Sequence, residues 1–124
     1  MNGFTLIELL VVLLFAGAAI ALAAPQLMPA RHALMAKSCA RELASALRAA
    51  RSEAIARQRE VAFVPGPALQ RRLLEARVAV SGMDPAIRFF ADGTSSGASV
   101  VLAASGRRHV VDVDRVTGRV AVRE

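Results

Sequence analysis

The sequence is poor in the residues that usually build enzyme sites and disulfide-bonded domains. Its 124 residues include one cysteine, Cys39, and neither tryptophan nor tyrosine. A single cysteine excludes an intrachain disulfide, and on an apolar helix face it is typical of a small buried side chain. The two histidines, His32 and His109, have no catalytic or metal-ligand spacing around them. We therefore predict no catalytic residue, no metal site, no cofactor and no enzymatic activity.

Lysine is almost absent as well, so the basic charge comes from arginine. Lys37 is the one lysine, and Lys and Arg together number 16 against 10 Asp and Glu, a formal net charge of +6. The arginines are spread from Arg31 to Arg123, which is typical of solvated faces. This balance permits contact with nucleic acid, anionic lipid or acidic protein surfaces and selects none of them.

Hydrophobic residues make up 55% of the chain but are unevenly distributed. Residues 4–24 form one apolar run in which Glu8 is the only charge. As a helix this run would be about 32 Å long, enough to cross a bilayer. A secretory signal peptide would need a basic start, and a plain membrane anchor gives no reason for Glu8. A carboxylate in an apolar span costs about 2.5–3.5 kcal/mol and is a functional hypothesis by default.

The residues GFTLIELLVV at positions 3–12 supply such a hypothesis. They resemble the class III signal of type IV pilins and type II secretion pseudopilins. This resemblance implies that prepilin peptidase cleaves between Gly3 and Phe4 and N-methylates Phe4. Glu8 then becomes the fifth mature residue, where the family has a glutamate, and Pro25 the twenty-second, where pilins often carry a proline.

The resemblance also implies partners and a location. Residues 1–3 would be a leader, the apolar run would cross the bacterial inner membrane once, and the rest would be periplasmic. In a filament of pilins or pseudopilins, each Glu8 would meet the free amine of a neighbour's Phe4. Because an unpaired buried carboxylate is strongly unfavourable, this pair would set the axial stagger of the subunits. The leader holds no Lys or Arg, so the orientation rests on the resemblance and Met1 is not fixed as the true start.

Residues 25–58 are expected to form an amphipathic helix after two prolines. Pro25 and Pro29 remove backbone donors, so the helix should kink or melt between residues 24 and 31. Further along, apolar residues recur every three or four positions and form one stripe, which we expect to dock on a sheet. The stripe consists of Cys39, Leu43, Leu47, Ala50 and Ala54. Glu53 and Arg57 are spaced as an i,i+4 ion pair.

Residues 59–124 switch to short β-favouring runs between turn residues, which predicts a globular part built on a sheet. Strands are expected at 60–64, 76–80, 87–90, 99–103, 108–113 and 119–122. Residues 69–77 also suit a helix, and Ser105-Gly106 favours a hairpin. The predicted fold class is α+β and pilin-like. A long N-terminal helix, half transmembrane and half amphipathic, packs on one small antiparallel sheet.

Three stretches resemble a narrower group. They are LASALRAARSEAI at 43–55, IRFFADGTSSG at 87–97 and VDVDRVTGRV at 111–120. All three are similar to minor pseudopilins of the type II secretion H type and to FimT-like pilus proteins (the GspH/FimT-like family). The resemblance implies a structural subunit of the periplasmic pseudopilus that assists protein export.

An alternative reading is a FimT-like minor pilin that binds DNA during uptake. Its candidate phosphate contacts are Arg107, Arg108, Arg119 and Arg123. No aromatic residue is interleaved with them, so binding would be phosphate-driven and salt-sensitive. The 111–120 stretch favours the secretion type.

The acidic residues near the C-terminus are expected to form ion pairs. Asp112 and Asp114 alternate along a predicted strand and could bind a cation, but a salt bridge with Arg108 or Arg119 is the favoured interpretation. Residues 92–97 lack the spaced ligands of a calcium loop.

Overall fold

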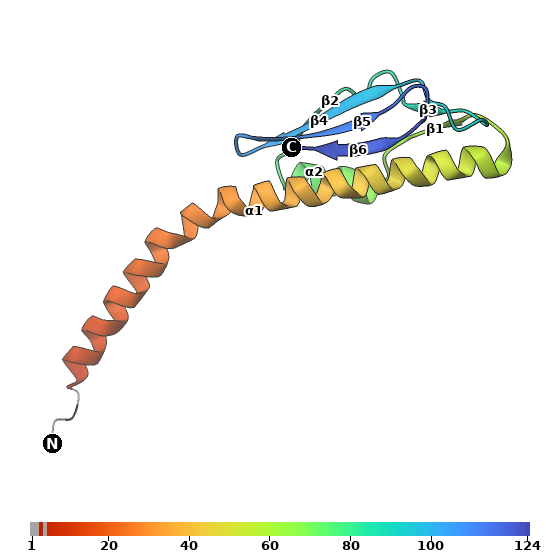
Figure 1. The fold of residues 1–124 in the computed structure, drawn as a ribbon. Coiled ribbons are helices and arrows are strands. Elements are labelled where there is room, and N and C mark those ends of the chain that lie inside the picture. Colours follow the sequence, from red (N-terminus) through yellow and green to blue (C-terminus); the bar gives the residue numbers. More distant parts are fainter. Residues whose placement is uncertain (1–2, 4) are drawn as a thin grey trace. The chain divides into compact units, whose positions relative to one another are not determined.

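The computed structural model describes residue 3 and residues 5–124, apart from the side chains of residues 24 and 26–29. The chain divides into two compact units, Met1–Arg31 and His32–Glu124. Helix α1, Leu6–Arg57, contributes to both (Figure 1). The other elements are β1 (Val61–Ala62), α2 (Pro67–Glu75), β2 (Ala79–Ser81), β3 (Arg88–Phe89), β4 (Ala98–Ala104), β5 (Arg107–Val113) and β6 (Val120–Arg123).

In the first unit, α1 is an exposed apolar helix. The segment Leu6–Ala23 is long and apolar enough to cross a membrane by length and composition, with a mean hydropathy of 2.7. None of this segment is buried within the chain. Its apolar side chains are therefore left for lipid or for other helices.

The prolines do not interrupt this helix. Helical backbone continues through Pro25 and Pro29, so the expectation of a melted turn between residues 24 and 31 is wrong. Proline removes one backbone donor and displaces one carbonyl, a local defect that the turns on either side can span. A kink at this place stays a prediction.

In the second unit, α1 packs on the sheet through the predicted stripe. Cys39, Leu43 and Leu47 are at most 1% exposed, and Ala54 is fully buried. Ala50 is half-buried against the same core. The structure adds a row of small residues to the stripe, Ala36, Ala40 and Ala44, all fully buried. The docking face is confirmed and is wider than the sequence pattern suggested.

The strands form two antiparallel sheets and not the single sheet expected. One sheet pairs β1 with β3, and the other has the order β2-β4-β5-β6. The strand predicted at 60–64 shrinks to Val61–Ala62 and reaches only β3.

The hairpin between β4 and β5 is confirmed. Val100 lies opposite Val111 and Leu102 opposite His109, and all four side chains are buried. Ser105 and Gly106 both have positive φ, 51° and 76°. Positive φ at both central residues is the requirement of a type I′ turn, whose twist matches that of the strands.

The strand predicted at 76–80 is largely wrong. Helix α2 extends to Glu75 with Ala76 as its C-cap, and β2 begins only at Ala79. Leu69 and Leu73 lie one helical turn apart and are both buried in the core. This burial favours a helix over the strand in the ambiguous stretch. The α+β class itself is confirmed.

Candidate functional site

The expected cleavage site lies before α1. Gly3 is exposed, and a Cβ built on it would meet no atom within 4 Å. The fold of the described residues therefore gives no reason for a glycine at this position. Phe4, the expected site of N-methylation, lies outside the described residues.

Glu8 lies in the first turn of α1, and its side chain is exposed. Its backbone N–H donates to Thr5 Oγ1 at 3.2 Å, so Thr5 is the N-cap of the helix. Thr5 and Glu8 thus have the spacing of a capping box, a local signal that the sequence analysis missed. Within the part of the chain that the structure describes, Glu8 forms no ion pair. A carboxylate at a helix N-terminus is also favourable for the helix dipole, so Glu8 has a local role besides the expected assembly role.

The four C-terminal arginines proposed as polyanion contacts are brought together only in part: Arg119 and Arg123 line one pocket, whereas Arg107 and Arg108 do not line it. Arg107 and Arg108 begin β5, whereas Arg119 precedes Val120, which pairs with Val113 at the other end of β5. Six residues of strand separate these ends, about 20 Å at ~3.3 Å per residue. Arg123 is engaged in an ion pair with Asp112.

The ion-pair partner predicted for Asp112 is wrong. Asp112 contacts Arg123 rather than Arg108 or Arg119, and it also accepts a hydrogen bond from Ser99 Oγ at 2.8 Å. Asp112 lies opposite Ala121 on β6, so Arg123 is its diagonal neighbour on the adjacent strand.

Asp114 lies just beyond β5 and shapes the turn that follows. Its Oδ1 accepts backbone hydrogen bonds from Val116 at 2.7 Å and Thr117 at 2.9 Å. These bonds, with that to Thr117 the stronger contribution, hold the pKa of the Asp114 carboxyl below its ordinary value. Across residue 3 and residues 5–124, no three His, Cys, Asp or Glu side chains are grouped to hold a metal ion.

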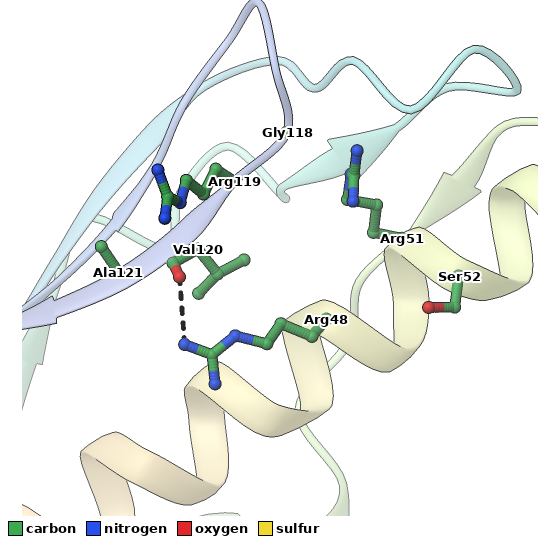
Figure 2. A pocket seen from close by; sticks show the side chains of 7 residues that line it. All are labelled: Arg48, Arg51, Ser52, Gly118, Arg119, Val120 and Ala121. Atoms are coloured by element: carbon green, nitrogen blue, oxygen red, sulfur yellow. Dashed lines mark hydrogen bonds between the residues drawn. The ribbon is translucent and has the colours of Figure 1, made fainter.

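A basic pocket lies between α1 and the turn before β6, and sequence reasoning missed it. Arg48, Arg51 and Arg119 line a space of about 660 Å³ (Figure 2). Arg48 Nη2 donates to Val120 O and Arg51 Nε donates to Gly93 O, each at 3.0 Å. Arg48 lies outside the apolar stripe of α1, and its side chain is exposed. Only the tertiary fold brings Arg119 to the same place.

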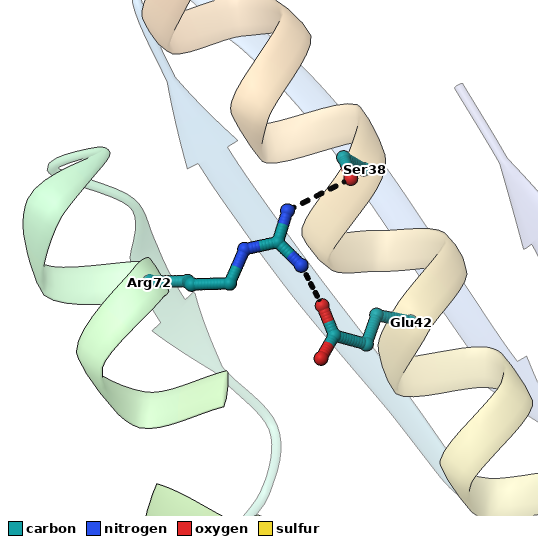
Figure 3. A network of polar contacts seen from close by, with 3 residues as sticks. All are labelled: Ser38, Glu42 and Arg72. Atoms are coloured by element: carbon teal, nitrogen blue, oxygen red, sulfur yellow. Dashed lines mark hydrogen bonds and ion pairs between the residues drawn. The ribbon is translucent and has the colours of Figure 1, made fainter. Parts of the chain in front are cut away.

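A further arginine, Arg72, connects α2 to α1. Arg72 of α2 forms an ion pair with Glu42 and donates to Ser38 Oγ at 3.0 Å (Figure 3). Both pairing side chains remain more than a third exposed. This contact links the two helices, and we assign it no further role.

Two candidate residues are core residues. Cys39 is fully buried, as expected, and burial raises the pKa of its thiol. His109 is 4% exposed on the core face of β5, and neither ring nitrogen has a hydrogen-bond partner among the described residues. His32, at the start of the second unit, is half-buried.

The described architecture defines a class of protein. An exposed apolar N-terminal helix with a glutamate in its first turn continues into an α+β unit with its own core. This arrangement is that of a type IV pilin-like subunit. The family model described as type II transport protein GspH matches residues 40–76, which span the docking half of α1, β1 and α2.

A curated relative extends the match over nearly the whole chain. Type II secretion system protein H of Xanthomonas campestris pv. campestris is 32% identical over 138 residues, covering 97% of this chain and 82% of that protein. No solved structure matches the chain significantly. The chain belongs to the GspH family of type II secretion proteins, whose members are minor pseudopilins. This is a family of structural secretion-system subunits and not of known enzymes.

Proposed function

We propose that the protein is a minor pseudopilin held in the inner membrane by Leu6–Ala23, with His32–Glu124 in the periplasm. It is incorporated into the pseudopilus with other pseudopilins and so assists protein export. The observation that carries this proposal is the apolar helix of the first unit, none of which is buried by the chain itself. An apolar surface of this length needs lipid or other helices around it.

Processing by prepilin peptidase is part of the proposal. Gly3 has no structural requirement within the described residues, which fits a requirement set by the processing enzyme. Gly17 is a matched control, because it too would place a Cβ in open space. With prepilin peptidase co-expressed, Gly3→Leu should leave the leader attached, whereas Gly17→Leu should be cleaved normally. Intact mass and N-terminal peptide mapping read out both cleavage and methylation of Phe4. Equal processing of the two variants would show that Gly3 is not the recognised residue.

The assembly role of Glu8 can be separated from its capping role. Glutamine can occupy the same place in a capping box but cannot pair as an anion with a neighbour's amine. We expect Glu8→Gln to keep the helix and to lose co-assembly and secretion as completely as Glu8→Ala. Cross-linking of subunits in membranes and export of a secreted enzyme are the measurements. Normal co-assembly of Glu8→Gln would contradict the ion pair and leave helix capping as the role of Glu8.

The alternative, a FimT-like pilin that binds DNA, has weaker support. Arg107 and Arg108 lie at one end of β5 and Arg119 beyond the other, and Arg123, opposite Val110, is paired with Asp112. Filter binding of the full chain to duplex DNA across a salt series tests it. Micromolar affinity that falls with salt and is lost in Arg119→Ala would favour this alternative over the secretion role.

A further inference from the structure

The basic pocket has the chemistry of an anion site. Its three arginines come from two parts of the second unit, Arg48 and Arg51 from α1 and Arg119 from the turn before β6 (Figure 2). Among the residues that the structure describes, no aspartate or glutamate lines it. Three guanidinium groups around one space repel each other, and an anion between them would remove that repulsion.

Two of the three arginines are fixed in place before any ligand arrives. Arg48 donates one N–H to the backbone carbonyl of Val120, and Arg51 donates one to that of Gly93. A guanidinium has five N–H donors, so both retain donors that no described residue uses. Pre-positioned donors lose less entropy on binding, which favours recognition over chance contact.

Gly118 keeps this arrangement possible. A Cβ at Gly118 would lie 2.0 Å from Gly93 O and 2.8 Å from Arg51 Nε, the two atoms joined by the Arg51 hydrogen bond. The chain therefore runs against Arg51 at a position where only glycine fits. The contact between Arg51 and the turn before β6 therefore depends on glycine at this position.

We propose that Arg48, Arg51 and Arg119 bind a carboxylate presented by an acidic side chain of another protein subunit. Carboxylates match the planar fork of arginine and form short, charge-assisted hydrogen bonds with it. The proposed filament role enters only in naming the carrier, a neighbouring pseudopilin. The evidence for the pocket comes from the geometry of the second unit and does not depend on the filament role.

A protein carboxylate fits this surface better than a nucleic-acid backbone. The adjoining pocket shares Arg119 and is also lined by Arg123, Asp112 and Asp114, so its lining carries no net positive charge. Backbone hydrogen bonds keep the pKa of Asp114 low, so it is ionised at neutral pH. A continuous row of phosphates leaving the first pocket over this side would cross two carboxylates with no excess of positive charge, whereas one acidic side chain ends within the pocket.

Titration of the full chain in a non-ionic detergent tests the pocket without any filament. The probes are a fluorescent Gly-Ser peptide with two central glutamates, the same peptide with glutamines, and a duplex DNA. We expect fluorescence anisotropy to show binding of the glutamate peptide and at least tenfold weaker binding of the glutamine peptide. Arg119→Glu and Arg48→Glu should each weaken the glutamate peptide at least tenfold. Arg71→Glu on α2 removes the same charge outside the pocket and should change the affinity less than twofold.

The outcomes decide between a site and a general basic surface. Equal losses in Arg71→Glu and Arg119→Glu, or equal binding of both peptides, would overturn the proposal. Tighter binding of DNA than of the glutamate peptide, lost in the same variants, would overturn it in favour of a polyanion surface. Far-UV circular dichroism of each variant separates these outcomes from unfolding. Arg119→Gln supplies a neutral variant, and the Arg119 side chain forms no hydrogen bond or ion pair with the described residues.

A second measurement identifies the carrier in assembled machinery. A photo-cross-linking residue at Ser52, on the pocket wall, should give adducts with another pseudopilin at a peptide that contains Asp or Glu. These adducts should disappear in Arg119→Glu. Adducts confined to peptides without acidic residues would contradict the carboxylate assignment even if the filament assembles normally.

Discussion

The close approach at Gly118 gives a sharp test of how the second unit is held together. Gly118 has φ of +69°, and alanine there would adopt a left-handed conformation that costs about 1–2 kcal/mol. Its Cβ would also overlap Gly93 O and crowd Arg51, displacing a charge-assisted hydrogen bond whose loss costs about 1–2 kcal/mol at a half-exposed site. Gly118→Ala should therefore destabilise the unit by about 2–4 kcal/mol, a large share of the stability of a small domain.

The single cysteine provides the assay. Cys39 is fully buried on the docking face of α1, so a maleimide reaches it only when the unit opens. Where opening and closing are fast relative to labelling, a loss of about 2–4 kcal/mol raises the labelling rate roughly 30- to 700-fold. The measurement needs no aromatic fluorophore, which suits a chain without Trp or Tyr.

Gly106 is the matched control. It has φ of +76° in the β4–β5 turn, but a Cβ there would meet no atom within 4 Å. Gly106→Ala should therefore show the backbone cost alone, about 1–2 kcal/mol and roughly a 5- to 30-fold faster labelling. Equal labelling rates for the two variants would refute the argument that Gly118 is required by its contact with Gly93 and Arg51.

Three further predictions follow from charge and burial. Burial raises the pKa of the Cys39 thiol, so with rising pH the unfolded state loses the thiol proton before the folded state does. In denaturant titrations, the free energy of unfolding should keep its full value below the ordinary thiol pKa and fall as pH rises above it. Cys39→Ala should not show this fall. The pKa of the Asp114 carboxyl is lowered, so its contribution to the free energy of unfolding should be present above the ordinary carboxyl pKa and be lost as pH falls through the lowered pKa. In the same titrations, Asp114→Asn should reduce the loss of stability on the acid side. A double-mutant cycle of Arg72→Ala and Glu42→Ala should give a coupling of about 0.5–1 kcal/mol that shrinks in high salt, and a coupling unaffected by salt would contradict an exposed ion pair.

The sequence predicted those parts of the fold that depend on local patterns, namely the buried face of α1 and the β4–β5 turn. The stripe through Cys39, Leu43 and Leu47 is buried as expected, because helical spacing alone places these side chains on one face. The Ser105-Gly106 turn is likewise local chemistry. By contrast, residues 69–77 suit either a helix or a strand until the core position of Leu69 and Leu73 decides between them.

The candidate site residues also fall into two groups, those that the sequence reveals and those that only the fold brings together. Gly3 and Glu8 belong to a contiguous motif and can be found without a structure. The pocket joins Arg48 and Arg51 to Arg119 across a long stretch of chain, and its shape depends on the approach of Gly118 to Gly93. Charge composition gives no sign of such a contact, because the arginines look evenly spread along the sequence. The diagonal pairing of Asp112 with Arg123 was missed for a related reason, since it depends on strand register.

The row of small side chains on α1 has a consequence for which mutations the subunit tolerates. Ala36, Ala40 and Ala44 are fully buried beside Cys39, so their small side chains are completely covered by neighbouring residues. Truncation has almost nothing to remove at these positions, whereas one added methylene group has no space and costs about 1–3 kcal/mol. At Leu43 and Leu47 the sensitivity is reversed, because shortening to alanine leaves a cavity and costs about 2–5 kcal/mol. Sequence variation in this helix should therefore be limited by maximum size at the small residues and by minimum size at the two leucines.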